Sequence, residues 1–215
     1  MFTGIIEHMG QISRVEQNAQ GAVLTIHTPG LASSLAVSNS IAVNGCCLTV
    51  VTLKGDFFTA DLSPETIAKT TLTRIGEGRA VNLEQPMSAG KEFGGHFVLG
   101  HVDGVGKVAK LDRDGDSWRY AVEVPPGIAP YVVLKGSITI DGISLTVADW
   151  DGRVAEIAVI PYTYDHTNIR DRKPGDPVNL EGDVLGKYIE QHLRAREARP
   201  ESARLTIESL KRQGF

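Results

Sequence analysis

Hydrophobic and polar positions alternate along much of the chain in short runs, as they do in half-buried β-strands. Apolar and β-branched residues recur over residues 22–27, 47–53 and 57–62, and again over 120–124, 144–150 and 154–159. Short turns at 54–56 and 151–153, each with a central glycine, separate the last two runs of each set, as in hairpins. Short helices are expected at 66–75 and 163–170. The pattern predicts about six short strands in each of two similar sets.

The two sets belong to an internal repeat. With a shift of 97 residues, positions 40–84 align with 137–181 without a gap, and 15 of the 45 pairs are identical. The segment NGCCLTV falls on DGISLTV, and the segment VNLE occurs in both copies. Further upstream the shift becomes 96, so that Gly4 and Gly10 fall on Gly100 and Gly106. Two copies are too few for a solenoid, and evenly spaced short strands favour a small closed barrel in each copy.

The segment after the second copy has a different period. A single stripe of largely apolar residues follows helical spacing there: Val184, Leu185, Tyr188, Ile189, His192 and Leu193. This spacing predicts a helix over 184–198, and 201–212 is expected to form a second helix after Pro200. Because the stripe lies outside both copies, it either packs on its own barrel or forms a contact between subunits.

Composition and charge exclude several classes of function but say little about the fold. The 215 residues are 41% hydrophobic and 22% charged, which is ordinary for a globular chain, and no run approaches the ~20 apolar residues that cross a bilayer. A net charge of −4 argues against nucleic acid as the main partner. The N-terminus has no basic segment or cleavage site of a signal peptide, and two adjacent cysteines make no disulfide framework. A cytoplasmic location is therefore expected.

Three short motifs that resemble known sites are set aside on their context. Residues 104–109 fit G-x-G-x-x-A, but no long helix follows them, as a dinucleotide site requires. Residues 142–146 lack the second glycine of a nucleophile elbow. His96 and His101 stand five residues apart with no acidic cluster, so no metal site is expected and His96 is expected to be structural.

Matched positions that differ in chemistry suggest two related sites with different tasks. Cys47 in the first copy matches Ser144 in the second, and Asn44 matches Asp141. A duplicated fold can hold two copies of one ligand. Where its polar residues diverge, one site can act as donor and the other as acceptor.

In combination, MFTGIIE, the pair NGCCLTV and DGISLTV, and GGHFVLGHVDG resemble the riboflavin synthase family of the alpha-chain type. The resemblance covers residues 1 to about 183, and the helical tail agrees with it. It implies a mostly β fold of two tandem six-stranded Greek-key β-barrels related by internal duplication, plus a C-terminal α-helix. The expected domains are an N-terminal lumazine-binding barrel (1–90), a C-terminal lumazine-binding barrel (91–183) and a helical segment for trimerisation (184–215).

The same resemblance implies an activity and partners. Two molecules of 6,7-dimethyl-8-ribityllumazine would exchange a four-carbon unit and give riboflavin and 5-amino-6-(D-ribitylamino)uracil, with no metal or redox cofactor. Each active site would hold two lumazines between the N-terminal site of one chain and the C-terminal site of its neighbour in a homotrimer. An association with lumazine synthase is left open.

Site residues are carried over by the resemblance onto matching positions. The first copy contributes an N-terminal loop, a strand and a second strand with the turn after it: Gly4, Ile5, Ile6, Cys47, Leu48, Thr49, Asp61, Leu62, Ser63, Pro64, Glu65 and Thr66. The second copy contributes Gly100, His101, Val102, Lys135, Ser144, Leu145, Thr146, Ala158, Val159, Ile160, Pro161, Tyr162 and Thr163.

Three of these residues are expected to act in catalysis. His101 is expected to transfer a proton, Ser144 to assist as a hydrogen-bond partner or nucleophile, and Cys47 to polarise the ligand. The segment PYTYDHTNI departs from the family pattern of Pro-Glu-Thr or Pro-His-Thr followed by Leu-Glu-Arg-Thr. Backbone contacts are therefore expected around Tyr162 rather than contacts of its side chain.

Two alternative functions fit parts of the pattern. Lumazine proteins of luminous bacteria share both barrels and hold a lumazine or flavin without catalysis, and flavin-dependent reductases have a similar flavin barrel. Nothing in the sequence resembles the nicotinamide domain that a reductase needs. The presence of Cys47 together with His101 and Ser144 favours the enzyme over the binding protein.

Overall fold

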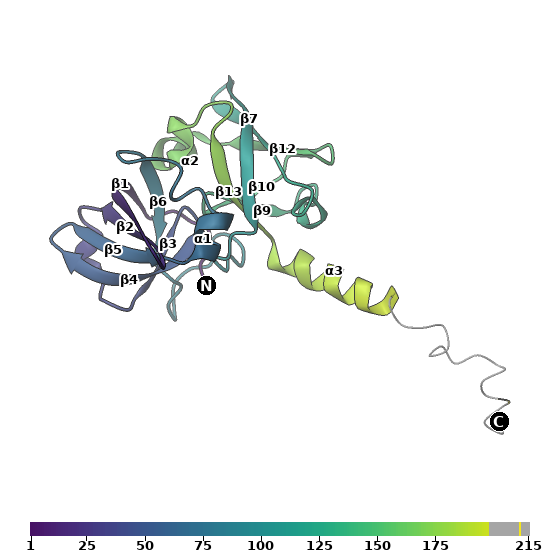
Figure 1. The fold of residues 1–215 in the computed structure, drawn as a ribbon. Coiled ribbons are helices and arrows are strands. Elements are labelled where there is room, and N and C mark those ends of the chain that lie inside the picture. The colour runs from purple at the N-terminus through teal and green to yellow at the C-terminus, as the bar shows by residue number, and fades with distance from the viewer. Residues whose placement is uncertain (198–210, 212–215) are drawn as a thin grey trace.

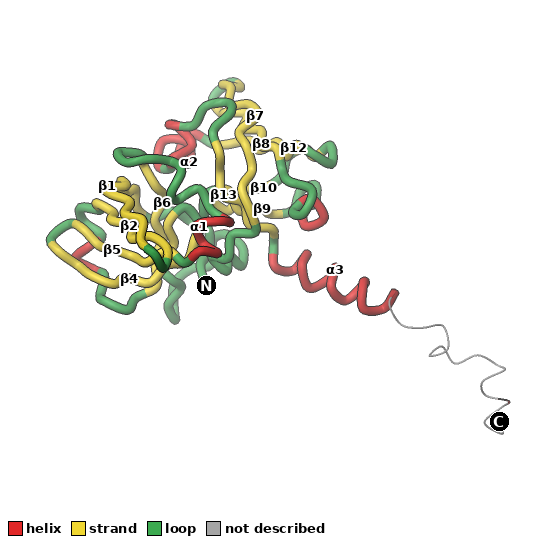
Figure 2. The backbone as a smooth tube through the Cα atoms, in the orientation of Figure 1, coloured by secondary structure: helices red, strands yellow, loops and turns green. Residues whose placement is uncertain are grey.

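A computed structural model describes residues 1–197 and residue 211 of the chain. Strands dominate it, and its helices are short except for the last one, α3 (Val184–Glu197) (Figure 2). The two halves of the chain form neighbouring β-domains, and α3 extends away from both (Figure 1). The mostly β fold with a C-terminal helix is confirmed.

The first half closes into a six-stranded antiparallel barrel. Its order is β1-β2-β5-β4-β3-β6, and β6 pairs again with β1. Alternate residues of each strand point inward and form one apolar core, because successive side chains of a strand face opposite sides. The strands are β1 (His8–Asn18), β2 (Gly21–His27), β3 (Ser40–Val43), β4 (Cys46–Lys54), β5 (Phe57–Leu62) and β6 (Ala80–Glu84).

The second half repeats this order with one strand cut in two. Its order is β10-β9-β13-β7-β8-β12-β11, in which β10 and β11 together match β4 of the first half. The strands are β7 (Gly104–Asp114), β8 (Ser117–Glu123), β9 (Ser137–Ile140), β10 (Ile143–Thr146), β11 (Asp149–Trp150), β12 (Val154–Val159) and β13 (Pro177–Gly182).

A β-bulge explains the seventh strand. In the first half, the ladder between β4 and β5 shifts register between Val50 and Thr52. The matching residues Val147 and Ala148 form the interruption between β10 and β11. Their amides still donate to the carbonyls of Gly136 at 3.0 Å and Glu156 at 2.7 Å, so the second sheet is hydrogen-bonded across the gap. The second half is therefore a seven-stranded sheet, a half-barrel with the strand order of the first barrel, rather than the second closed six-stranded barrel that the sequence predicts.

The helices within the barrels are shorter than the sequence pattern predicts. The helix expected at 66–75 is α1 (Pro64–Lys69), and the one expected at 163–170 is α2 (Pro161–His166) followed by a 3₁₀ turn, η3 (Asn168–Asp171). Proline occupies the first turn of both helices, where its missing N–H costs nothing. The Thr70 hydroxyl donates to the carbonyl of Thr66 at 2.7 Å and the chain then extends, which ends α1.

The two barrels contact each other at a pair of matched turns. Asn44 and Asp141 adopt positive φ angles of 45° and 47°, and each is followed by a glycine. A Cβ atom on Gly45 would lie 2.7 Å from the amide nitrogen of Gly142, so only glycine permits this approach. Side-chain amides cross the junction: the Asn82 Nδ2 donates to the Asp141 carbonyl at 2.9 Å. The junction between the barrels is thus closely packed and polar.

The C-terminal helix α3 contacts the second barrel through residues of its first half. Lys187 Nζ lies 2.6 Å from an Asp103 carboxylate oxygen, and Gly186 lies close to the backbone and Cβ of Tyr131 in a 3₁₀ turn, η2 (Ala129–Tyr131). The four large apolar residues of the predicted stripe are exposed: Leu185, Tyr188, Ile189 and Leu193. The helix predicted over 201–212 lies outside the described residues, apart from residue 211. None of the described helices is long and apolar enough to cross a membrane.

Candidate lumazine sites on the two barrels

Each candidate site begins on a strand whose side chains alternate between core and surface. In β4, Leu48 is buried in the core, while Cys47 is half-buried and Thr49 is exposed on the outer face. In β10, Leu145 is buried, and Ser144 and Thr146 match the outer two positions. Leu48 and Leu145 could therefore take part in these candidate sites through their backbone alone. Only the outer residues can offer side chains to a ligand.

The strand beside each site strand adds further residues to the same outer face. The register that pairs Val50 with Ala60 places Thr49 beside Asp61, whose side chain is exposed at the end of β5. The matching residue in the second barrel is Ala158, which has no polar group. The carboxylate at 61 thus gives the first site an acceptor for ligand hydroxyl groups, and the second site lacks it.

The helix entries differ between the barrels as well. Ser63 caps α1, and its hydroxyl accepts from the amide of Thr66 at 3.1 Å. Its counterpart Ile160 has no capping group and is 57% exposed, and Tyr162 is also exposed. The second helix start therefore lacks the side-chain cap of the first and exposes apolar surface instead.

Two segments cross from one barrel to the site of the other, and we call residues 2–4 and 98–100 the crossing segments. Phe2 and Val98 pair in an antiparallel bridge. The Gly4 carbonyl accepts from the amide of Ser144 at 2.8 Å, and the Gly100 carbonyl accepts from the amide of Cys47 at 2.9 Å.

The crossing corrects the expected grouping of site residues. The residues that follow each segment lie with the other barrel: Ile6 packs against the core of the second barrel, and Val102 against that of the first. Gly100, His101 and Val102 therefore belong beside Cys47, and Gly4 to Ile6 belong beside Ser144. The sequence resemblance groups residues 100–102 with the second site, whereas the amide of Cys47 in the first barrel donates to the Gly100 carbonyl. Matched sequence positions do not reveal such a crossover.

His96 makes the contact that sequence reasoning missed. Its Nδ1 lies 2.7 Å from the Ser144 hydroxyl, and its Nε2 lies 3.1 Å from the Thr139 hydroxyl. Burial lowers the pKa of His96, against a smaller opposing effect of Asp183. A neutral imidazole bonded to a serine on the ligand face can pass a proton in either direction. The repeat alignment pairs His96 with no residue of the first half, so comparison of the halves offers no signal for it.

The other expected polar residues occupy different surroundings. His101 is exposed just beyond the crossing segment that covers Cys47. Lys135 adopts a positive φ of 63°, and its Nζ donates to the Ala148 carbonyl at 3.0 Å. Burial, with smaller contributions from the adjacent Cys47 and then Glu181, raises the pKa of the Cys46 thiol to about 12, so Cys46 is an inert core residue.

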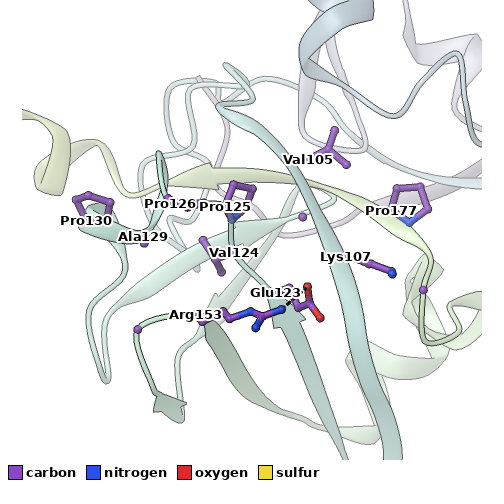
Figure 3. Close-up of a pocket in the computed structure, with 13 residues that line it drawn as sticks. Val105, Lys107, Glu123, Val124, Pro125, Pro126, Ala129, Pro130, Arg153 and Pro177 are labelled. Atoms are coloured by element: carbon purple, nitrogen blue, oxygen red, sulfur yellow. Dashed lines mark ion pairs between the residues drawn. The ribbon is translucent and has the colours of Figure 1, made fainter.

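One cavity lies away from the expected site residues. It has a volume of about 770 Å³ and lies on the second barrel, where Pro125, Pro126, Pro130 and Pro177 line it (Figure 3). Arg153 and Glu123 pair across 3.5 Å beside it (Figure 3). None of the expected site residues lines this cavity. A smaller hollow of about 250 Å³ includes Trp118 and Ala158 and so borders the second candidate site.

The comparisons with known proteins agree with this geometry. A model of the lumazine binding domain matches residues 3–86 and again residues 99–183. In solved structures, the fold is similar to LumP complexed with riboflavin, with a TM-score of 0.80 and 26% identity over 85% of this chain and 99% of that one. LumP complexed with 6,7-dimethyl-8-(1'-D-ribityl) lumazine gives a TM-score of 0.78. Fold and site thus define a protein with two lumazine-binding domains.

Relatives of known function narrow the class. The riboflavin synthase of Actinobacillus pleuropneumoniae is 42% identical over 215 residues, which is 100% of both chains. That of Bacillus subtilis is 37% identical over the same full length, and that of Mycobacterium tuberculosis is 41% identical over 91% of this chain and 99% of its own. The chain belongs to the riboflavin synthase family.

Proposed function

We propose that this chain is a transferase, a riboflavin synthase, which converts two molecules of 6,7-dimethyl-8-ribityllumazine into riboflavin and 5-amino-6-(D-ribitylamino)uracil. This is the last step of riboflavin biosynthesis. The observation that carries the proposal is the double match to the lumazine binding domain within a full-length relative of riboflavin synthases. A reaction between two copies of one substrate needs two sites for it, and the duplicated barrels offer them.

The reaction needs no outside oxidant. One lumazine gives up four carbons and becomes the uracil product, and the other gains them and becomes riboflavin, so the atoms of the products equal those of the two substrates. The first step removes a proton from the C7 methyl group, whose carbanion delocalises into the ring. Holding the two rings in register turns an encounter between solutes into a reaction of bound partners, which supplies much of the rate.

The polar residues divide this work between the sites. In the second site, Ser144 and the neutral His96 at 2.7 Å form the proton-transfer pair. In the first site, His101 serves as a second proton-transfer group, and Cys47 contacts the ring. Backbone groups of Leu48, Leu145 and their neighbours bind the pyrimidinedione edge, and Asp61 binds ribityl hydroxyls in the first site.

Catalysis requires a second copy of the chain in this proposal. In this proposal, the closely packed junction at Asn44 and Asp141 keeps the two sites of one chain apart, so that rings bound there do not stack on each other. A homotrimer in which the first site of one chain faces the second site of its neighbour meets this requirement, and the exposed stripe of α3 supplies an apolar contact. The domain division at 1–90, 91–183 and 184–215 and a cytoplasmic location belong to the same proposal.

Incubation with the lumazine alone tests the activity. Riboflavin and the pyrimidine product are expected in equal amounts, followed by absorbance and by chromatography. The second candidate is a binding protein, which the similarity to ligand-bound LumP favours. Tight binding of the lumazine without any product, at every protein concentration, would reject the enzyme and support that candidate.

A further inference from the structure

Two buried carboxylates have no part in the proposed chemistry, yet they occupy matched places. Glu84 ends β6 of the first barrel, and Glu181 lies near the end of β13 of the second; each is 2% exposed. Burial of a carboxylate costs free energy unless hydrogen bonds compensate it. The retention of an acid at both positions therefore calls for a structural reason.

Backbone donors of the crossing segments satisfy both carboxylates. Glu84 accepts from the Thr3 amide at 2.7 Å, the Thr3 hydroxyl at 2.8 Å and the Gly4 amide at 3.0 Å. Glu181 accepts from the Leu99 amide at 2.7 Å and the Gly100 amide at 3.0 Å. Only a carboxylate offers acceptors on both oxygens to two successive N–H groups, because the glutamine amide replaces one oxygen by a donor.

The two glycines whose amides donate to these carboxylates, Gly4 and Gly100, lie against the candidate sites. Gly4 and Gly100 have φ angles of 78° and 80°, which glycine adopts without strain. A Cβ on Gly4 would lie 2.6 Å from the Cβ of Ser144, and one on Gly100 would lie 2.6 Å from the Cβ of Cys47. Each carboxylate thus fixes a glycine against the outward residue that begins the site strand of the other barrel.

We propose that Glu84 and Glu181 are positioning residues with crossed action: Glu84, in the first barrel, orders the site at Ser144 in the second, and Glu181, in the second barrel, orders the site at Cys47 in the first. The assignment of these places as lumazine sites rests on the proposed function. The crossed action itself rests on hydrogen bonds and close contacts alone. A purely local role would instead alter the site of the barrel that carries the substitution.

The thiol of Cys47 reports on the first site directly. It is half-buried beneath the crossing segment at Gly100. The neighbouring Cys46 is buried and its thiol has a high pKa, so it is not expected to react with an alkylating reagent. Glu181→Gln is expected to speed alkylation of Cys47 by iodoacetamide at pH 8 about fivefold or more, because one of the two amides loses its acceptor. Glu84→Gln is the matched control and is expected to leave the rate within about twofold.

A reciprocal reporter tests the second site. Ser144→Cys in a Cys47→Ala background moves the single reactive thiol to the matched position, and Cys47→Ala alone sets the unreactive baseline. Here Glu84→Gln is expected to speed alkylation and Glu181→Gln to leave it unchanged. Reversal of the pattern, equal effects at both positions, or no effect of either substitution would overturn the proposal.

A milder substitution tests the proposal if these variants fail to fold. Thr3→Val removes one donor to Glu84 and keeps the backbone, and it is expected to raise hydrogen exchange at the Ser144 amide but not at the Cys47 amide. An equal increase of hydrogen exchange at the two amides would contradict crossed action. Since neither labelling nor exchange uses the lumazine, the positioning role can fail while product formation persists, and product formation can fail while the positioning role holds.

Discussion

At the scale of single residues, buried polar groups surround the hydroxyl of Ser144 and can carry out proton transfer in the proposed reaction. His96 is held between two hydroxyls, at 2.7 Å and 3.1 Å, and burial keeps its pKa below the usual value. It is therefore neutral near pH 7 and can accept or return a proton through the serine. The matched first site has a thiol in place of the hydroxyl, so the duplicated sites differ in their capacity for proton transfer.

This pairing predicts a non-additive loss of activity. Ser144→Ala is expected to lower kcat by about 10²-fold with little change in KM, because the proton relay acts in the transition state. His96→Ala is expected to cost a similar factor, and the double variant no more than either single one. Steady-state kinetics with the lumazine, alongside circular dichroism to verify folding, would decide; multiplicative losses would contradict a shared relay.

The titration of Glu181 makes the free energy of unfolding depend on pH. Burial raises the pKa of its carboxyl from 4.5 to about 7, against the opposing effect of the Leu99 and Gly100 amides. The unfolded chain loses this proton near pH 4.5 and the folded chain near pH 7, so Glu181 lowers the free energy of unfolding as pH rises through this window. Below and above the window, its contribution is constant.

Glu181→Gln removes this titration. The free energy of unfolding of the variant, minus that of the parent, is expected to become more positive between pH 4.5 and 7, by about 3 kcal/mol at most, and then to level off. Urea unfolding at closely spaced pH values measures the difference. A difference that stays flat across this range would show that the carboxyl titrates normally.

At the scale of elements, the two copies use the same strands and helices with different terminal residues. Helix α1 begins with a capping serine, and α2 begins with exposed Ile160 at the matched position. Ser63→Ala is expected to lower the free energy of unfolding by about 1 kcal/mol, because the Thr66 amide loses its partner. Ile160→Ser is expected to raise it by up to about 1 kcal/mol. Urea unfolding of both variants tests this, and destabilisation by Ile160→Ser would contradict it.

The elements themselves are largely readable from the sequence. Alternation predicts β4, β5, β10 and β12, and the turn glycines predict the hairpins, because side chains of a strand alternate by geometry. The helix limits and the interruption of the second barrel were not predicted. Both depend on local hydrogen bonds, such as that of Thr70 with Thr66, and on a bulge that hydropathy does not record.

At the scale of the whole molecule, one buried ion pair reinforces the junction between the barrels. Arg172 lies 2.5 Å from Asp141, with side-chain exposures of 3% and 1%. The matched residues of the first copy are Ile75 and Asn44, so only one copy carries this charge pair. Asp141 also accepts from the Asn179 amide at 2.9 Å, which ties the turn to β13.

This asymmetry predicts a compensation. Asp141→Asn is expected to cost about 3–5 kcal/mol of unfolding free energy, because it leaves Arg172 buried and unpaired. Adding Arg172→Ile, which copies the pair of the first barrel, is expected to recover most of the loss. Equilibrium unfolding of the two single variants and the double variant forms a complete cycle; additive losses would contradict the compensation.

Assembly should depend on the exposed stripe of α3. Leu185→Asp together with Ile189→Asp is expected to shift the sedimentation of the protein from the proposed trimer towards the monomer and to abolish product formation, since apolar contact area is lost. Gln191→Asp on the opposite face of the helix is the control and is expected to preserve both. A monomeric parent that remains fully active would contradict the shared active site.

By itself, the sequence determined the duplication, the mostly β class, the apolar stripe of the last helix and the strands that carry Cys47 and Ser144. These features follow from periodicity and from identity between the halves, which are properties of the linear chain. Only the tertiary structure decided that Gly4 lies against Ser144 and Gly100 against Cys47, that His96 bonds Ser144, and that Glu84 and Glu181 hold the crossing segments. Contacts between residues about 50 to 140 positions apart in sequence depend on how two packed barrels exchange their leading segments, and no local pattern of polarity encodes that exchange.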